Sequence, residues 1–267
     1  PFLHPLPPDA SDIAQNSQIK APPQKSRREH DIEKLLSRID TKPLLAYLFS
    51  EDEESLAPAI VSLTATSVRD TAMRLTPSGP LFLAKEGAVF MNGGRLLSAA
   101  AGQRLSLCIR RSDEFTLEAA IMPADANHRG PARIVSISYD SALRNFTLGQ
   151  DGDRWVLRLR TEKTGYNGTN PEVYHEGLAP RHTHIAVTYS DGDERIYSNG
   201  GEIHRTDTVK GTLANWSDAY PLVFGNEAYD ARDWAGVIRF AAFYDKALTG
   251  EEIRMLADGL PAGVYLL

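Results

Sequence analysis

Hydrophobic and polar residues alternate in short runs along most of this chain. Between residues 181 and 201, Ile185, Val187 and Tyr189 fall on one face of an extended segment. The sequence Ser190-Asp191-Gly192-Asp193 follows at once and favours a tight turn, because aspartate and glycine accept a positive φ at low cost. This segment is therefore predicted to be an antiparallel hairpin.

The same period of two recurs in runs separated by glycine, proline and asparagine turns. Strands are predicted over residues 44–49, 59–64, 71–76, 81–84, 88–91, 115–121, 133–138, 145–150, 154–160, 221–225 and 237–244. In the run 154–160, Trp155 and Leu157 point to one face, predicted to be core, while Arg158 and Arg160 make the other face rich in arginine. Residues 161–176 are predicted to be one long polar loop. Many short strands with tight turns predict an all-β fold of two antiparallel sheets.

Three segments have helical spacing instead, namely 31–39, 97–111 and 249–257. Ser98 is the expected N-cap of the second, and a capping box at Thr249 begins the third. The first places a set of apolar residues on one face: Ile32, Leu35, Leu36 and Ile39. This face either caps one end of the β-domain or docks onto another protein.

Residues 1–28 are rich in proline and polar residues, a composition that cannot bury a core of its own. We expect this extended N-terminal arm to lie against the domain or against a partner. The chain accordingly divides into the arm with its short helix, residues 1–43, and a β-sandwich, residues 44–267.

Composition narrows the functional classes. A net charge of −6 lacks the basic footprint of a nucleic-acid-binding protein. No apolar run approaches the roughly 20 residues that span a bilayer. A single cysteine, Cys108, allows no intrachain disulfide and lies among apolar residues as a buried, inert thiol would. The chain begins at Pro1 rather than Met, which leaves room for an upstream signal or anchor.

Several blocks carry a family likeness. FTLEAAIMP, RIVSIS, NFTLGQDGDRWVLRLRT, HIAVTYSDGDERIYSNGG, PLVFGNE and the ending VIRFAAFYDKALTGEEI resemble, in this order, the laminin-G-like and concanavalin-A-like lectin/glucanase superfamily. The likeness covers roughly residues 44–257. The loop TGYNGTNPE is similar to one in bacterial extracytoplasmic members, some of them attached to membrane proteins. The resemblance implies a two-sheet antiparallel jelly-roll sandwich that binds glycans, proteins or Ca²⁺, with a subset of members acting as glycosidases or lyases.

Catalytic residues are not apparent. A glycosidase needs two carboxylates flanking the scissile bond, and the glucanase branch places them on one strand, whereas Glu118 stands alone in its strand. His182 and His184 face the same way, as two metal ligands would, but packing is the favoured interpretation because neither a cysteine nor a third histidine lies nearby. We expect a protein without enzymatic activity.

Calcium is the one cofactor that the loops suggest, because hard cations take several oxygen ligands. The candidate ligands are Asp151, Asp153, Glu227 and Asp233. In many relatives an acidic pair in the last strand helps to bind the ion, but Arg239 and Phe240 stand at that position here. Solvated loop acids explain the four residues equally well.

A glycan site needs an exposed aromatic ring beside polar donors. The candidate ligand-binding residues are Tyr166, Asn167, Trp216, Asn226, Glu227, Asp233 and Trp234, and Tyr229 is a further loop aromatic.

Two functional hypotheses follow. The favoured one is a non-catalytic interaction or structural module outside the cytoplasm, periplasmic or at the cell surface, serving as an accessory subunit of a partner protein or membrane complex. The alternative is a carbohydrate-binding module.

Overall fold

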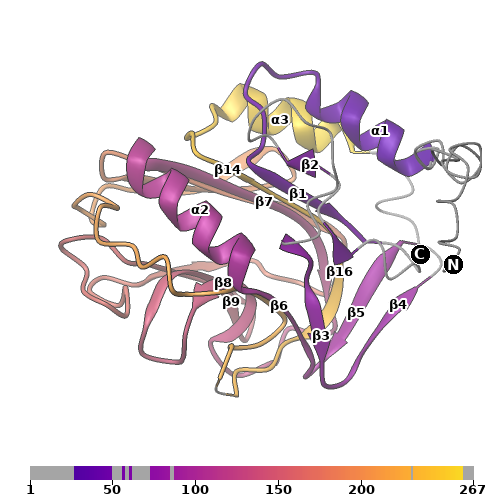
Figure 1. Cartoon of the computed structure of the whole chain (residues 1–267), viewed down its shortest axis with the longest axis horizontal. Coiled ribbons are helices and arrows are strands. Elements are labelled where there is room, and N and C mark those ends of the chain that lie inside the picture. Colours follow the sequence, from indigo (N-terminus) through magenta and orange to yellow (C-terminus); the bar gives the residue numbers. More distant parts are fainter. Residues whose placement is uncertain are drawn as a thin grey trace, which may run out of the picture.

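The computed structural model describes residues 27–49, 56–57, 60–61, 73–84, 87–229 and 231–260. Residues 1–26 of the arm predicted over residues 1–28 therefore lie outside the described residues. Within them the protein is mostly β, with two antiparallel sheets packed face to face and three helices at the periphery (Figure 1). The predicted all-β sandwich is confirmed.

The larger sheet contains nine described strands. They are β1 (Leu45–Leu48), β2 (Ile60–Val61), β4 (Leu81–Ala84), β5 (Ala88–Asn92), β7 (Glu114–Pro123), β12 (Thr183–Ser190), β13 (Asp193–Ser198), β14 (Gly201–Thr206) and β16 (Ala235–Tyr244). Their order is β14-β13-β12-β7-β16-β1-β2, while β5 pairs with β16 and β4 pairs with β5. The predicted hairpin is β12–β13, and it turns at Asp191 and Gly192, both of which have a positive φ.

The smaller sheet contains seven described strands. They are β3 (Thr76–Ser78), β6 (Arg95–Ser98), β8 (Ala132–Ser138), β9 (Arg144–Asp151), β10 (Arg154–Leu159), β11 (Val173–Glu176) and β15 (Leu222–Phe224). Their order is β11-β10-β9-β8-β15-β6-β3. β11 lies inside the stretch predicted to be a loop, which is a correction. Its polar residues carry no period-two signal, and it forms because its backbone completes the edge of β10.

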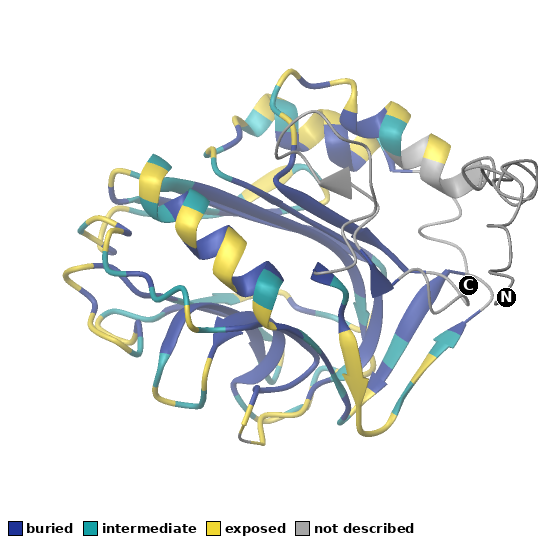
Figure 2. Ribbon diagram, in the orientation of Figure 1, coloured by how far each residue is buried: buried dark blue, intermediate teal, exposed yellow. Residues whose placement is uncertain are grey.

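The main core lies between the two sheets. Phe115, Leu117, Ala119 and Ile121 of β7 all point into it, as their alternation predicts. Aromatic rings join the sheets across this layer, since Phe224 of the smaller sheet meets Tyr47 and Phe49 edge-on at 5.9 Å between centroids. Trp155 is buried here, as predicted. Burial is concentrated on the two sheets, while the turns and the outer sides of the helices are exposed (Figure 2).

A second core covers the outer face of the larger sheet. There α1 (Arg27–Leu36) and α3 (Gly250–Gly259) lie together over the sheet (Figure 1). Leu35, Leu36 and Ile39 are buried in this cluster with Tyr197 and Phe240.

The prediction that the apolar face of the first helix docks onto a partner is therefore wrong for Leu35, Leu36 and Ile39. These side chains are already covered by the protein's own sheet and by α3. The side chain of Ile32 lies outside the described residues. The alternative interpretation, a helix that caps the β-domain, is the correct one.

The second predicted helix is α2 (Ala99–Ser112). The hydroxyl of Ser98 accepts a hydrogen bond from the N–H of Ala101 at 3.2 Å, so this residue is the N-cap as expected. Cys108 is only half-buried on this helix, whereas the sequence predicted a buried thiol, and burial raises the pKa of its thiol. Within the described residues, no helix is long and apolar enough to cross a membrane.

Candidate ligand-binding site

The two tryptophans predicted to bind a ligand are fully buried. The indole N–H of Trp216 donates to the carbonyl oxygen of Arg160 at 2.8 Å, and that of Trp234 donates to Oε1 of Gln150 at 2.8 Å. Both rings belong to the main core. The prediction that they present ring faces to a ligand is wrong, because their apolar area and their one donor are both satisfied inside the protein.

Glu227 and Asn226 are buried as well, and their contacts are internal. Glu227 forms an ion pair with Arg133 at 2.8 Å, with both side chains at zero exposure, and accepts a further hydrogen bond from the hydroxyl of Ser138. The amide oxygen of Asn226 accepts from the N–H groups of Glu227 and Arg232 at 2.8 and 2.7 Å. Both residues shape the loop after β15 rather than meeting a ligand, which corrects their predicted role.

The predicted calcium site is not assembled. Asp151 is paired with Arg154 at 2.5 Å and, with Asp153, lines a shallow depression at the β9–β10 turn. Glu227 is buried against Arg133, and Asp233 is exposed on another loop. Across the described part of the chain, no three His, Cys, Asp or Glu side chains come together in a way that would hold a metal ion. The four acids are partners of arginines or solvated loop residues.

His184 packs internally, as favoured. Its Nε2 lies 2.9 Å from Oε2 of Glu118, and the hydroxyl of Tyr244 also donates to Glu118. All three side chains are buried on the outer face of the larger sheet, whose apolar residues α1 and α3 cover. Without solvent-exposed surface, Glu118 is a structural group in this conformation.

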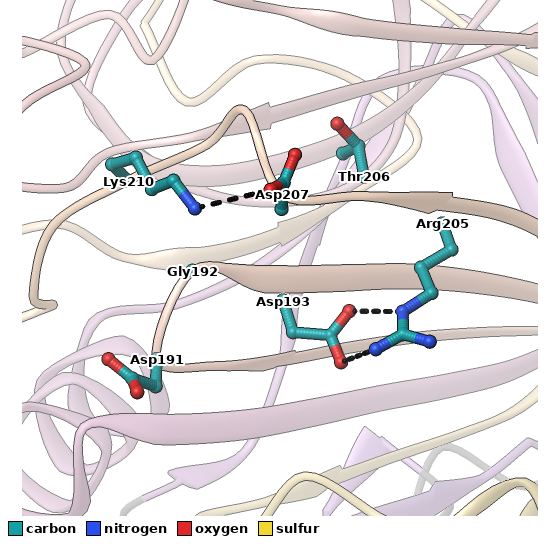
Figure 3. A pocket seen from close by; sticks show the side chains of 7 residues that line it. All are labelled: Asp191, Gly192, Asp193, Arg205, Thr206, Asp207 and Lys210. Atoms are coloured by element: carbon teal, nitrogen blue, oxygen red, sulfur yellow. Dashed lines mark hydrogen bonds and ion pairs between the residues drawn. The ribbon is translucent and has the colours of Figure 1, made fainter.

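A depression beside the β12–β13 turn is lined by charged residues that already neutralise one another (Figure 3). Asp193 accepts from Nε and Nη2 of Arg205 at 2.9 and 3.1 Å, and Lys210 lies 3.6 Å from Asp207. A hydrogen bond from Arg195 holds the pKa of Asp193 below its usual value, so this carboxylate is charged at neutral pH. The depression offers a new ligand little beyond surface ion pairs.

Exposed aromatic rings gather at one end of the smaller sheet. Tyr139, Tyr166 and Tyr229 are 45%, 66% and 66% exposed, and Tyr220 is half-buried between them. The ring of Tyr139 lies 4.8 Å from that of Tyr229 and 6.4 Å from that of Tyr220. The guanidinium of Arg160 links Tyr220 to Tyr166. We call these four tyrosines the tyrosine patch.

Four separate segments supply the patch, and each is held by local contacts. Tyr139 opens the β8–β9 turn, where Oδ1 of Asp140 accepts from the N–H groups of Ala142 and Leu143, both at 2.8 Å. The carbonyl oxygen of Tyr166 accepts from the N–H of Arg144 at 3.1 Å, which fixes the loop after β10 to the start of β9.

Tyr220 and Tyr229 flank β15. A Cβ on Gly102 of α2 would come 2.2 Å from the carbonyl oxygen of Tyr220, so glycine lets the helix approach this segment closely. Beyond β15, Arg95 donates to the carbonyl oxygen of Glu227 at 2.7 Å and steadies the turn that leads to Tyr229.

A group of arginines lies behind the patch on the outer face of the smaller sheet. Arg158 pairs with Glu172 at 2.5 Å, and Arg133 pairs with Glu227. Burial lowers the pKa of Arg144 to about 9, and the like charge of Arg133 adds to this effect. The arginine-rich face predicted for residues 154–160 is therefore real, and it continues onto β8 and β9.

The sequence identified part of this site. Tyr166 and Tyr229 were candidates and are exposed, while Asn167 is half-buried beside them with its Oδ1 unpartnered. Tyr139 and Tyr220 were missed. Both are single tyrosines next to strand ends, and no periodic pattern connects segments so far apart in the chain.

Comparisons with known proteins agree with the fold. A sequence profile described as the concanavalin A-like lectin/glucanases superfamily (Laminin_G_3) matches residues 98–254. No curated protein sequence is similar enough to this chain to count as a match.

Solved structures with a similar fold include the binding domain of botulinum neurotoxin DC in complex with rat synaptotagmin II, at 14% identity and a TM-score of 0.57, covering 82% of this chain and 52% of that one. Another is described as a receptor binding domain, at 13% identity and a TM-score of 0.60. The match covers 85% of this chain and 53% of that structure. A third is the botulinum neurotoxin DC binding domain in complex with SialylT, at 14% identity and a TM-score of 0.57. The match covers 83% of this chain and 52% of that structure. This chain thus spans about half the length of these structures, and at such identities the likeness concerns the fold.

Proposed function

The chain belongs to the concanavalin A-like lectin/glucanase superfamily, and from that membership we propose that it is a non-catalytic binding module whose tyrosine patch binds carbohydrate. The observation that carries the proposal is the gathering of four tyrosines from four segments, two of which lie against one arginine. Flat aromatic faces beside polar donors suit sugar rings, which present apolar C–H faces and polar hydroxyl edges.

Two further observations support this proposal. Tyr139, Tyr166 and Tyr229 make up half of the six large hydrophobic side chains that are exposed in the described part of the chain. Among the fold neighbours, one binding domain is in complex with SialylT, and the cell entry of another toxin depends on two ganglioside molecules. These neighbours are binding domains, which supports a binding role for this chain.

A glycan array tests the proposal. The variants Tyr166→Ala and Tyr229→Ala remove exposed rings and should keep the fold, as circular dichroism would verify. We expect each to weaken binding to the array's hits by about ten-fold, the effect of losing a ring worth roughly 1–1.5 kcal/mol. Phe82→Ala is the matched control, because Phe82 is 59% exposed on β4 of the other sheet. Unchanged binding by the Tyr166→Ala/Tyr229→Ala double variant would rule out this site.

A second candidate function is docking onto a protein partner, the hypothesis that the sequence favoured. The observation behind it is a partly exposed aromatic pair across β4 and β5, in which β4 pairs only with β5 among the described strands. Phe82 stacks on Phe90 with ring centroids 4.5 Å apart and an interplanar angle of 6°. Strand edges of this kind accept a further strand from a partner.

For this candidate we propose an accessory subunit of a membrane complex outside the cytoplasm. Purification from native membranes, with mass spectrometry of what accompanies the chain, tests it. Stoichiometric membrane proteins should be lost on Phe82→Asp or on removal of residues 1–26, and retained with Tyr166→Ala. Recovery of the chain in the cytoplasmic fraction, without companions, would refute this second candidate.

A further inference from the structure

Arg160 occupies the centre of the tyrosine patch. Its guanidinium carbon lies 4.6 Å from the ring centroid of Tyr166 and 6.0 Å from that of Tyr220. Its backbone is fixed on both sides, because its N–H donates to the carbonyl oxygen of Asn145 at 2.8 Å and its own carbonyl oxygen accepts from Trp216. The residue as a whole is only 7% exposed, so its guanidinium is held in place rather than free in solvent.

Among the described residues, no carboxylate pairs with Arg160. Its neighbour on the same strand face, Arg158, is paired with Glu172, and Arg133 is paired with Glu227. Arg160 forms neither an ion pair nor a side-chain hydrogen bond with the described residues, and its Nε is buried without a partner. Only Nε is both buried and unpartnered, so the two Nη groups remain open to solvent between the rings. A cation that is held in place without a counter-charge, with its Nη groups in reach of solvent, can pair with an arriving anion.

Arg144 adds a second charge that forms no ion pair with any of the described residues. Its Nη1 donates to the hydroxyl of Thr147 at 3.2 Å and its Nη2 to the carbonyl oxygen of Ser141, both neutral groups, while its buried Nε has no partner. The two acidic residues near Arg144 already have partners: Asp140 accepts from the N–H groups of its own turn, and Glu227 is paired with Arg133. Because the N–H of Arg144 holds Tyr166, the two unpaired arginines flank the same loop.

We propose that the tyrosine patch selects acidic sugars, whose carboxylate or sulfate group pairs with the Nη groups of Arg160 while the sugar ring lies on the tyrosines. This inference rests on the proposed carbohydrate-binding function and specifies its ligand class. The planar guanidinium matches the two oxygens of a carboxylate or sulfate, and the flanking rings limit its motion. The positive charge is local, because the chain as a whole carries a net charge of −6.

Matched pairs of ligands test the selection. Oligogalacturonate is compared with its neutral methyl ester, and sulfated dextran oligosaccharide with unmodified dextran, by isothermal titration at low and high salt. The acidic member of at least one pair should bind about 10- to 100-fold more tightly, as expected for hydrogen bonds between charged groups, and added salt should reduce this difference. Which pair responds distinguishes a carboxylate ligand from a sulfate ligand.

Arg160→Met removes the charge but keeps a side chain of similar length. It should abolish the preference for the acidic member, so that the acidic and neutral members of each pair bind equally. Arg205→Met is the control, since it changes the net charge equally but removes an arginine already paired with Asp193. If melting curves show that Arg160→Met does not fold, Arg160→Lys replaces it and should weaken the preference several-fold, because lysine lacks the planar fork.

Four results would overturn the inference, and they separate it from the function on which it rests. Equal binding of acidic and neutral members, lost on Tyr166→Ala, would leave a carbohydrate-binding patch without acid selection. An equal loss in Arg160→Met and Arg205→Met would indicate a general charge effect. Retention of the full preference in Arg160→Met would place the selecting group elsewhere, and its full retention in Arg160→Lys would contradict the role of the planar guanidinium. Failure of every glycan to bind would overturn both the inference and the proposed function.

Discussion

Single residues on the outer face of the smaller sheet show how this protein handles buried charge. Arg133 and Glu227 are both completely buried and form one ion pair, whereas Arg144 is buried among neutral acceptors. Burial keeps the pKa of Arg144 near 9, so it remains a cation at neutral pH. Burying these charges is unfavourable unless a partner compensates them, so substituting a partner should destabilise the folded protein.

The variant Glu227→Gln should therefore destabilise the protein by about 3–5 kcal/mol, because it leaves the guanidinium of Arg133 buried without a counter-charge. Urea unfolding at pH 7 would measure the loss. The control is Asp151→Asn, whose partner Arg154 is 42% exposed, so that pair should contribute only about 0–1 kcal/mol. Equal losses of stability in the two variants would contradict the expectation that Glu227 compensates a buried charge.

Glu194 gives a second prediction at this scale. It is fully buried on β13, neither carboxyl oxygen has a partner, and burial raises its pKa from 4.5 to about 8. The folded protein thus binds one more proton than the unfolded chain between those two values, so its stability falls as pH rises through this window, by about 1.4 kcal/mol per pH unit.

Glu194→Gln removes this ionisation. Its stability relative to the natural protein should rise from pH 5 to about pH 8 and then level off. Urea unfolding at pH 5, 6.5 and 8 would follow the change, with Glu202→Gln on the partly exposed β14 as the comparison. A stability gain that is the same at every pH would contradict the prediction.

At the scale of elements, the helices belong to the sandwich rather than to a partner. Leu35 of α1 lies against α3 so closely that a Cβ on Gly259 would come 2.4 Å from its Cδ1. The hydroxyl of Thr41 also donates to Glu252 of α3 at 3.1 Å. The two helices and the outer face of the larger sheet are thus one packed layer.

Leu35→Ala should lower the free energy of unfolding by about 2–5 kcal/mol, because it leaves a cavity between α1 and α3. Lys34→Ala, one residue earlier and exposed, should change it by less than about 0.5 kcal/mol. Thermal or urea unfolding would measure the free energy of unfolding of both variants. If α1 served mainly as a docking helix, Leu35→Ala would leave stability unchanged and would reduce partner binding instead.

At the scale of the whole molecule, the last long strand joins distant parts of the chain. β16 pairs with β7 on one side and with both β1 and β5 on the other. The family profile covers residues 98–254 and so omits β1 and β5. A fragment limited to the family match would therefore expose one edge of β16, which is apolar along most of its length.

We expect the fragment 98–254 to aggregate or to remain unfolded, and the fragment 27–260 to fold as a monomer. Circular dichroism and size-exclusion chromatography of the two fragments would show the difference. A cooperative thermal transition and a monomeric elution volume for the shorter fragment would contradict this expectation.

Local physics explains what could be predicted from the sequence. The alternation in β7, the turn at Asp191 and Gly192, and the caps at Ser98 and Thr249 each depend on residues within a few positions of one another. These signals determined the all-β class, most of the strands and the three helices. They also placed Arg158 and Arg160 on one face, and Arg160 is the arginine of the candidate site.

Only the tertiary structure decided which loop residues face solvent. Trp216 is buried because its indole reaches Arg160, 56 positions earlier, and Tyr139 and Tyr229 meet although 90 residues of chain separate them. The free arginine at the centre of the patch is equally a result of packing, because no local pattern shows which carboxylates will lie within reach. The exposure and pairing of side chains depend on contacts between distant segments, and a period of two or of 3.6 residues carries no information about those.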